Sequence, residues 1–357
     1  MSTSDTAQMR MLTRKPAQTC GSAARISAFA KAHRAALADV RVDVEGGRAG
    51  ADLVPVTAAG CYAPGGRFPL PSSVLMTALT ARAAGVETVV VASPRPAPVT
   101  LAAAALAGAD FFLAVGGAQA VAAMAFGIEG LPQCDVIVGP GNAYVTAAKQ
   151  LVSGEVRIDM LAGPSELLAL ADEHADPALV AADLLAQAEH DPDAFPMLVT
   201  TSAALLDATE AALFEQLATL PTRSMAEVAL QRGAAVVVEN LEQACAVANA
   251  LAPEHLAVHV REPTTLRPQL RHFGALFLGE GCAEVFGDYG TGPNHVLPTG
   301  GTARSQGGLS VLDFLRTQMW LELAPDAAPQ LVDDVVRFAR LEGLEAHARA
   351  AEMRRRP

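Results

Sequence analysis

The sequence predicts an α/β protein that contains two parallel-sheet domains and ends in a helical tail. Short runs rich in valine and leucine, with the length of strands, alternate with longer alanine-rich segments that have the length of helices. This strand-then-helix spacing is typical of parallel sheets with crossover helices. The chain has 357 residues, too many for one simple core, and its 51% hydrophobic and 4% aromatic content favours alanine-rich helices packed on Val/Leu strands.

The first strand-and-helix series follows a lead at 1–22 that we expect to be disordered and a helix that we expect at 23–38. Ser72 and Ser73 can cap a helix that runs to residue 84, and Gly85 ends it. The series then continues with strands at 87–92, 111–115 and 135–138, followed in turn by helices at 99–108, from 118, and through 151.

A second series repeats the alternation and leads into the tail. Its strands are expected at 166–171, 196–201, 234–240, 256–260 and 275–279, with helices at 177–190, 203–218 and 241–251. After about residue 308 the sequence predicts no further strands. Residues 309–322 and 328–352 are predicted to be helical, which makes the last part of the chain an appended α tail.

Composition and charge argue against several classes of function. The net charge is −12 and no basic patch with interleaved aromatic residues occurs, so neither nucleic acid nor an anionic membrane surface is an expected partner. No apolar run is long enough to span a membrane, and the polar start lacks the apolar centre of a secretory signal. The five cysteines are scattered without CxxC spacing, which indicates a reducing cytoplasm.

Glu254 and His255 follow Pro253 directly, at the point where an apolar strand is about to begin. A carboxylate and an imidazole are costly to bury unless they are paired or used. The pair is therefore either a partly exposed strand entrance or the acid–base end of an active site, since both groups can titrate near neutral pH.

Gln187 and His190 are three residues apart near the end of a predicted helix, so they share one face. This spacing lets two side chains chelate one metal, although solvated side chains are commoner at a helix C-terminus. The loop GDYGTGPNHVLPTGG (287–301) places Asp288 and His295 among several glycines. Such a loop either wraps a ligand or is a flexible surface segment.

Two glycine turns, GPGNAY (139–144) and VGGAQA (115–120), follow predicted strands and open helices. Glycines there let the backbone approach a phosphate at a helix N-terminus, but neither turn is GxGxxG, and tight packing is an equal alternative. Taken alone, Glu342 and His347 in the tail have the pattern of ordinary exposed helix residues. Structural roles are assigned to the histidines without an evident partner, which are His33, His174, His259 and His272.

Taken together and in order, six stretches resemble the histidinol dehydrogenase family: GPGNAYVTAAK, IDMLAGPSE, DLLAQAEHDP, APEHLAV, GDYGTGPNHVLPTGG and EGLEAH. The resemblance covers residue 25 to the C-terminus. It implies two incomplete Rossmann-like domains. It also implies an NAD- and zinc-dependent oxidoreductase that converts L-histidinol, through L-histidinal, to L-histidine in the last steps of histidine biosynthesis.

The resemblance assigns roles to the residues at matching positions. Glu254 and His255 match the catalytic proton acceptors. The residues that match contacts to NAD are Tyr62, Gln119 and Asn142. The residues that match zinc ligands are Gln187, His190, Asp288 and His347. The residues that match substrate contacts are Ser165, Gln187, His190, His255, Asp288, His295, Glu342 and His347.

In the family, the ligand that matches His347 comes from the partner subunit, so the resemblance implies a homodimer with shared active sites. The implied division is a segment at 23–61 that packs on the second α/β domain, an NAD-binding domain at 62–165, a zinc and catalytic domain at 166–308, and a tail at 309–357 that is exchanged between subunits. His255 is expected to take the hydroxyl proton, and Glu254 to activate the water for the second oxidation.

The chain departs from the family pattern in two places. It is expected to lack most of the family's N-terminal helical segment, and Arg67 follows the Gly-Gly pair near the cofactor turn. Because an added cation suits an anionic group, another small polar alcohol such as a sulfonated diol is an alternative substrate. A shortened, non-catalytic paralogue is a second alternative, against which the intact set of matching site residues argues.

Overall fold

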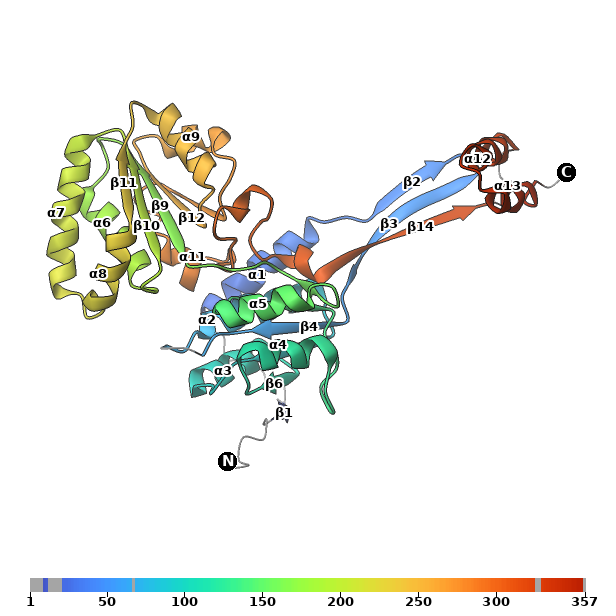
Figure 1. Ribbon diagram of the computed structural model, residues 1–357, viewed down its shortest axis with the longest axis horizontal. Coiled ribbons are helices and arrows are strands. Elements are labelled where there is room, and N and C mark those ends of the chain that lie inside the picture. Colours follow the sequence, from blue (N-terminus) through green and yellow to red (C-terminus); the bar gives the residue numbers. More distant parts are fainter. Residues whose placement is uncertain (1–8, 12–20, 66–67, 325–328, 356–357) are drawn as a thin grey trace. The chain divides into compact units, whose positions relative to one another are not determined.

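The computed structural model describes residues 9–11, 21–65, 68–324 and 329–355 (Figure 1). The chain divides into two structural units, the first formed by Met1–Arg34 and Val56–Phe314 and the second by Ala35–Pro55 and Leu315–Pro357. The first unit contains two α/β sheets whose strands are almost all parallel. The predicted fold class is therefore confirmed.

The first sheet has the strand order β1-β6-β5-β4-β7-β8, and only β1 runs antiparallel to its neighbour. Leu113, Ile137 and other strand side chains pack against α4 and α5 through residues such as Met124 and Val145. The elements around this sheet are β1 (Met9–Met11), α1 (Gly21–Ala35), β4 (Ala58–Tyr62), α2 (Pro71–Ala84), β5 (Thr88–Ala92), α3 (Pro98–Leu106), β6 (Phe111–Leu113), α4 (Gly117–Phe126), β7 (Val136–Val138), α5 (Ala143–Val152) and β8 (Arg157–Ile158).

The second sheet is wholly parallel, with the order β11-β10-β9-β12-β13. Its strands are β9 (Glu166–Ala171), β10 (Phe195–Thr200), β11 (Ala234–Val237), β12 (His255–His259) and β13 (Ala275–Leu278). Its helices are α6 (Pro177–Ala188), α7 (Ala203–Thr219), α8 (Arg223–Arg232), α9 (Leu241–Leu251), α10 (Pro263–Leu266) and α11 (Val285–Tyr289), with 3-10 turns η1 (Arg267–Gln269), η2 (Thr302–Arg304) and η3 (Val311–Phe314).

The central strand β9 is buried on both faces because its side chains alternate between them. Leu168 and Leu170 belong to a core cluster with Ala244 and Ala248 of α9. Ala169 and Ala171 belong to another cluster, which contains residues of α6 and α7. A strand that is covered on both faces has apolar side chains at consecutive positions, which is why the run ELLALA at 166–171 predicts a buried strand.

The second unit consists of an antiparallel sheet and two helices. The sheet has the order β14-β3-β2, formed by β14 (Leu315–Leu323), β3 (Gly47–Pro55) and β2 (Val40–Val44). Figure 1 shows these three strands as a long ribbon. The helices α12 (Pro329–Leu341) and α13 (Glu345–Glu352) pack against each other through Val332, Val336 and Ala348.

The helical prediction for residues 309–322 is wrong over most of its length, because Leu315–Leu323 forms strand β14. Leu315, Met319, Leu321 and Leu323 all lie at odd positions, as one face of a strand requires, and Thr317 and Trp320 favour extended backbone. The partner strand β3 lies far away in the sequence, so the pairing that decides the conformation is not visible locally.

The N-terminal part of the chain also differs from expectation. Met9–Met11, inside the lead expected to be disordered, forms β1, whose pairing with β6 is a long-range contact; the flanking 1–8 and 12–20 lie outside the described residues. The segment at 23–61 contains α1, β2, β3 and β4, and it is divided between the two units. In α1, the Ser22 hydroxyl and the Arg25 guanidinium donate hydrogen bonds to the carbonyls of Tyr289 and Gly290.

The core of the second sheet should determine the stability of the first unit. Replacing Leu168, which is fully buried on β9, with Ala should lower the free energy of unfolding by about 2–5 kcal/mol, because the change loses buried area and leaves a cavity. Leu151→Ala is the control, since that side chain is 85% exposed and its loss should change stability by less than about 0.5 kcal/mol. Urea unfolding of both variants measures the difference, and equal losses would contradict this description of the core.

Candidate active site

The Glu254–His255 pair lies at the amino-terminal edge of the second sheet. Helix α9 ends at Leu251, its C-cap residue Ala252 adopts a left-handed conformation (φ 51°), and Pro253 leads the chain into β12, whose first residue is His255. Both side chains are buried, with 7% of Glu254 and 3% of His255 exposed. The partly exposed strand entrance that the sequence left open is therefore excluded.

The Glu254 carboxylate is held by the start of the neighbouring strand β9. Its Oε2 accepts a hydrogen bond of 2.6 Å from the Ser165 hydroxyl and one of 2.9 Å from the Glu166 backbone N–H. Burial raises the pKa of Glu254 to about 8, although these two hydrogen bonds oppose the rise. A carboxyl group with such a pKa can exchange a proton near neutral pH.

The His255 ring is oriented by the same strand. Its Nδ1 lies 3.0 Å from the Glu166 carbonyl oxygen, and because a carbonyl only accepts, Nδ1 is the nitrogen that carries the hydrogen. The Nε2 atom is then the proton-accepting position of the neutral ring. Phe277 packs near the imidazole, with ring centroids 6.1 Å apart.

Three residues expected to bind metal come from two elements of the first unit. Gln187 lies in the last turn of α6, and His190 follows the end of that helix. Asp288 lies in α11, with its Oδ2 3.9 Å from Nε2 of His190 and its Oδ1 3.4 Å from Nδ1 of His295. The structure thus brings His190, Asp288 and His295 together.

Gln187 is fully buried, yet neither its amide nitrogen nor its oxygen has a hydrogen-bond partner among the described residues. Buried amides nearly always have partners, so an orphaned one indicates a group that binds something else. A metal ligated through the Gln187 oxygen fits this position, three residues before the imidazole of His190.

Glu284 belongs to this cluster although the sequence analysis missed it. His190, Glu284 and Asp288 offer ligand atoms that all lie within 4.8 Å of one another. Glu284 directly precedes α11 and is fully buried. The available signal was its spacing of four residues from Asp288, which places both on one side of a helical turn.

The pKa values of these groups are shifted in different directions, which suits the groups to different roles. Burial raises the pKa of Glu284 to about 7. For Asp288 burial also opposes ionisation, but the neighbouring His295 outweighs it and holds the pKa of that carboxyl below its usual range. Burial lowers the pKa of His190. A carboxylate at Asp288 and a neutral imidazole at His190 are the protonation states that bind metal.

The residues expected to contact NAD lie at the carboxyl edge of the first sheet. Tyr62 ends β4, Gln119 lies in the first turn of α4, and Asn142 precedes α5. The Gly117 N–H donates to the Tyr62 hydroxyl at 3.1 Å, which joins Tyr62 to the first residue of α4, the helix that carries Gln119. The chain reverses its strand order between β4 and β7, and such a switch point is where open α/β sheets bind ligands.

The turn at 139–142 is held in a fixed conformation. The Lys149 ammonium donates to the Gly139 carbonyl at 3.0 Å and pairs with the buried Asp159 carboxylate. The Asp159 carboxylate in turn accepts from the Gly139 N–H at 2.7 Å. Asn142 caps α5 by accepting from the N–H groups of the next turn, so its amide is partly used by the fold.

Two of the remaining residues that the sequence analysis assigned to the site belong to the second unit. Glu342 follows α12 and His347 lies in α13, and both are exposed residues of the second unit. Arg67 lies outside the described residues.

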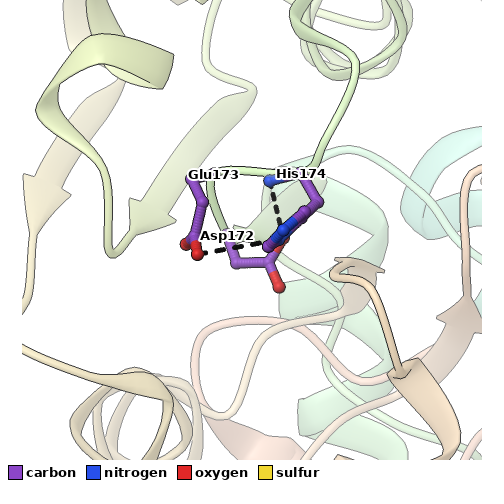
Figure 2. Close-up of side chains that lie close together, drawn as sticks. All are labelled: Asp172, Glu173 and His174. Carbon is purple, nitrogen blue, oxygen red and sulfur yellow. Dashed lines mark hydrogen bonds and ion pairs between the residues drawn. The ribbon is translucent and has the colours of Figure 1, made fainter.

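A second cluster of metal-ligand type contains Asp172, Glu173 and His174 (Figure 2). The Asp172 carboxylate accepts from the N–H groups of His174, at 3.0 Å, and Arg261, at 3.1 Å, so it stabilises a turn after β9. Glu173 is largely exposed. The structural assignment of His174 is consistent with these contacts.

Comparison with known proteins identifies the family. A sequence model described as histidinol dehydrogenase matches residues 7–355, almost the whole chain. The chain belongs to the histidinol dehydrogenase family. It is therefore an oxidoreductase of that family, as the six ordered motifs indicated.

Individual relatives agree with this membership. The chain is 51% identical to the histidinol dehydrogenase of Thermus thermophilus over 87% of this chain and 76% of that protein. It is 45% identical to that of Methylococcus capsulatus over 93% of this chain and 77% of that protein. The crystal structure of histidinol dehydrogenase from Elizabethkingia anophelis superposes with a TM-score of 0.89 at 36% identity, covering 94% of this chain and 78% of that one.

More distant structures share the fold alone. A propionaldehyde dehydrogenase from Rhodopseudomonas palustris has a TM-score of 0.52 at 14% identity, over 81% of this chain and 80% of that one. The paired α/β sheets of the histidinol dehydrogenase family are therefore an arrangement that other oxidoreductases also use.

The buried Glu254 should make stability depend on pH. Its pKa of about 8 in the folded state exceeds the ordinary value of 4.5, so the folded state holds this proton more tightly than the unfolded state. The contribution of Glu254 to stability therefore falls as the pH rises from 4.5 through 8. In metal-free protein at about pH 9, Glu254→Gln should exceed wild type in stability by up to about 4 kcal/mol, and by little at about pH 4.

Urea unfolding between about pH 4 and pH 9 measures this difference. The control is Glu239→Gln, an exposed carboxylate beyond β11, which should follow wild type at every pH. A Glu254→Gln curve parallel to wild type would contradict the raised pKa.

Proposed function

We propose that this chain catalyses the NAD-linked, zinc-dependent oxidation of L-histidinol through L-histidinal to L-histidine, the last steps of histidine biosynthesis. Family membership supports the reaction. The observation that carries the proposal is that the buried His255 ring, beside Glu254, lies 3.8 Å from Glu284, whose ligand atoms lie within 4.8 Å of those of His190 and Asp288. Metal-assisted alcohol oxidation needs side chains that transfer protons and side chains that can ligate the metal.

We propose Gln187, His190, Asp288 and His347 as the zinc ligands. The orphaned amide of Gln187 and the ionisation of Asp288 favour a bound cation at the first three. When bound, zinc supplies a Lewis acid that anchors and polarises the substrate. A single carboxylate among these ligands leaves the site with net positive charge, which suits polarisation of an oxygen.

We propose Tyr62, Gln119 and Asn142 as the residues that contact NAD. Their support is the switch point of the first sheet and the N-termini of α4 and α5, where backbone N–H groups favour phosphate. Gly139, with φ 112°, comes so close to Tyr62 that an added Cβ would lie 2.1 Å from the Tyr62 carbonyl oxygen. When bound, NAD accepts the hydride in each of the two oxidations.

The protein residues then handle the protons. Because the Glu166 carbonyl fixes the hydrogen on Nδ1 of His255, Nε2 is available to take the proton of the substrate hydroxyl. The second oxidation requires addition of water to the aldehyde, and ionised Glu254 takes a proton from that water. Ser165 hydrogen-bonds to Glu254 and thereby holds its Oε2. His295, beside Asp288, and Glu342 are proposed substrate contacts, together with Ser165 and the four proposed ligands.

We propose a homodimer in which His347 and Glu342 complete the active site of the partner. The second unit supports this because it exposes large apolar side chains that a monomer would leave in water. Met319 is 87% exposed and Phe338 68% exposed. Further exposed apolar residues of this unit are Val40, Val42, Leu321, Leu341 and Met353.

The remaining expectations follow from the reaction. The partner is a small-molecule substrate, and the net charge of −12 disfavours nucleic acid. Among the described helices, none is long and apolar enough to cross a membrane. We propose the cytoplasm as the location, because the enzyme would draw there on the NAD and substrate of a biosynthetic pathway.

The reaction should be visible as NADH formation. Zinc-loaded protein should form two NADH per L-histidinol, and His255→Asn should lower the rate by about 100-fold or more because proton transfer is lost. Glu254→Gln should act mainly on the second oxidation and lower the NADH yield per histidinol. Glu239→Gln, an exposed carboxylate, is the control and should behave as wild type.

A folded, zinc-loaded wild type that forms no NADH from L-histidinol would overturn the proposed substrate. NADH formation from a sulfonated diol would then support the alternative alcohol. Inactivity with both would favour the non-catalytic paralogue.

Sharing of the active sites should be visible in mixed dimers. His255→Asn and His347→Ala should each be inactive alone. Mixed and reassembled in equal amounts, they should recover about a quarter of wild-type activity, because half of the dimers are mixed and each of these has one intact site.

Mixing His255→Asn with Glu254→Gln is the control and should give no more activity than the average of the two variants alone, since both changes lie in the same unit and every site of a mixed dimer carries one of them. Recovery in neither mixture, with reassembly shown by chromatography, would indicate a site completed within one chain.

A further inference from the structure

Glu284 is a buried carboxylate that the proposed mechanism does not use. It is fully buried directly before α11, and neither carboxylate oxygen has a hydrogen-bond partner among the described residues. It does not cap the helix that it precedes. An unsatisfied buried carboxylate lowers stability, so its presence requires a compensating role.

The nearest group of opposite potential charge is His255. Oε1 of Glu284 lies 3.8 Å from Nε2 of His255, which is beyond hydrogen-bond distance but close enough for a strong electrostatic interaction in a buried site. Nδ1 on the opposite side of the ring is occupied by the Glu166 carbonyl. The imidazole is thus bracketed by a backbone acceptor on one nitrogen and a carboxylate on the other.

Other charged groups also face this imidazole. Oε2 of Glu254 lies 3.6 Å from Nδ1, on the side away from Glu284. The His255 ring also interacts electrostatically with Glu166 on β9, His190 after α6 and Asp288 in α11. Glu284 is the carboxylate nearest to Nε2, the atom that would take the substrate proton.

We propose that Glu284 is a positioning residue that stabilises the His255 imidazolium formed when Nε2 takes the proton of the alcohol. No bond to Glu284 forms or breaks: the proton moves from the substrate hydroxyl to Nε2, and the carboxylate lowers the energy of the resulting cation. The chemical role rests on the proposed function, whereas the electrostatic pairing of the two side chains does not.

Glu284→Gln separates charge from shape, because the amide has nearly the same volume. In zinc-loaded protein, kcat for histidinol should fall about 10- to 100-fold while KM changes less than about twofold, since the charge acts on the proton transfer rather than on binding. Zinc content should remain one per site. Glu239→Gln, with an exposed carboxylate, should leave kcat and KM unchanged.

A purely structural role predicts a different result. Loss of packing would lower the melting temperature of metal-free protein, whereas removal of an unsatisfied buried charge should leave it unchanged or higher at about pH 8. A lowered melting temperature with unchanged kcat would overturn the proposal. Loss of zinc from Glu284→Gln would also overturn it, by making Glu284 a metal ligand.

A spectroscopic measurement tests the electrostatic pairing of Glu284 and His255 without an activity assay. In metal-free protein with 15N-labelled histidine, assigned through His255→Asn, Glu284→Gln should shift the ring 15N resonances of His255, because it removes the carboxylate that lies 3.8 Å from Nε2. An unchanged His255 signal would overturn the pairing. A changed signal in a wild type that does not oxidise histidinol would support the pairing and reject the proposed substrate.

Discussion

The parallel pairing of β9 with β12 is the constraint on which the candidate site depends. Its register places His255 opposite Leu167, so the residues that precede each strand meet at one edge of the sheet. The Ser165 hydroxyl and the Glu166 N–H then reach the Glu254 carboxylate, and the Glu166 carbonyl reaches the His255 ring. A shift of one residue in this register would turn His255 to the opposite face of the sheet.

The amino-terminal location of this edge is unusual, because parallel α/β sheets generally bind ligands at the carboxyl ends of their strands. The edge proposed for NAD on the first sheet follows the general rule, whereas the edge that holds Glu254 and His255 does not. Strand β8 ends at Ile158 on the carboxyl edge of the first sheet, and β9 begins at Glu166 on the amino edge of the second. Within the first unit, this short connection joins the edge proposed for NAD to the edge that holds the acid–base pair.

The sequence revealed the parts of this arrangement that depend on local patterns. Continuous apolar runs identified strands such as β9, and the ordered motifs identified the family and predicted candidate site residues such as Glu254, His255 and Asp288. Strand β14 was missed because its conformation depends on pairing with β3, which is distant in the sequence. Glu284 was missed because an acidic residue before a short helix resembles a solvated cap, and only burial distinguishes the two.

Burial acts differently on the carboxyl groups of the candidate site. It raises the pKa values of Glu254 and Glu284 because it outweighs the groups that favour their ionised forms, whereas Asp288 lies beside His295 and has a lowered pKa. Groups whose pKa values are pushed apart can act as proton acceptor and as permanent anion at the same pH. Asp288 is thus suited to hold a cation, and Glu254 to exchange a proton. Because a nearby positive charge favours the ionised form of a carboxyl group, a cation held by Asp288 would favour ionisation of the two glutamates, and metal binding would be coupled to readiness for proton transfer.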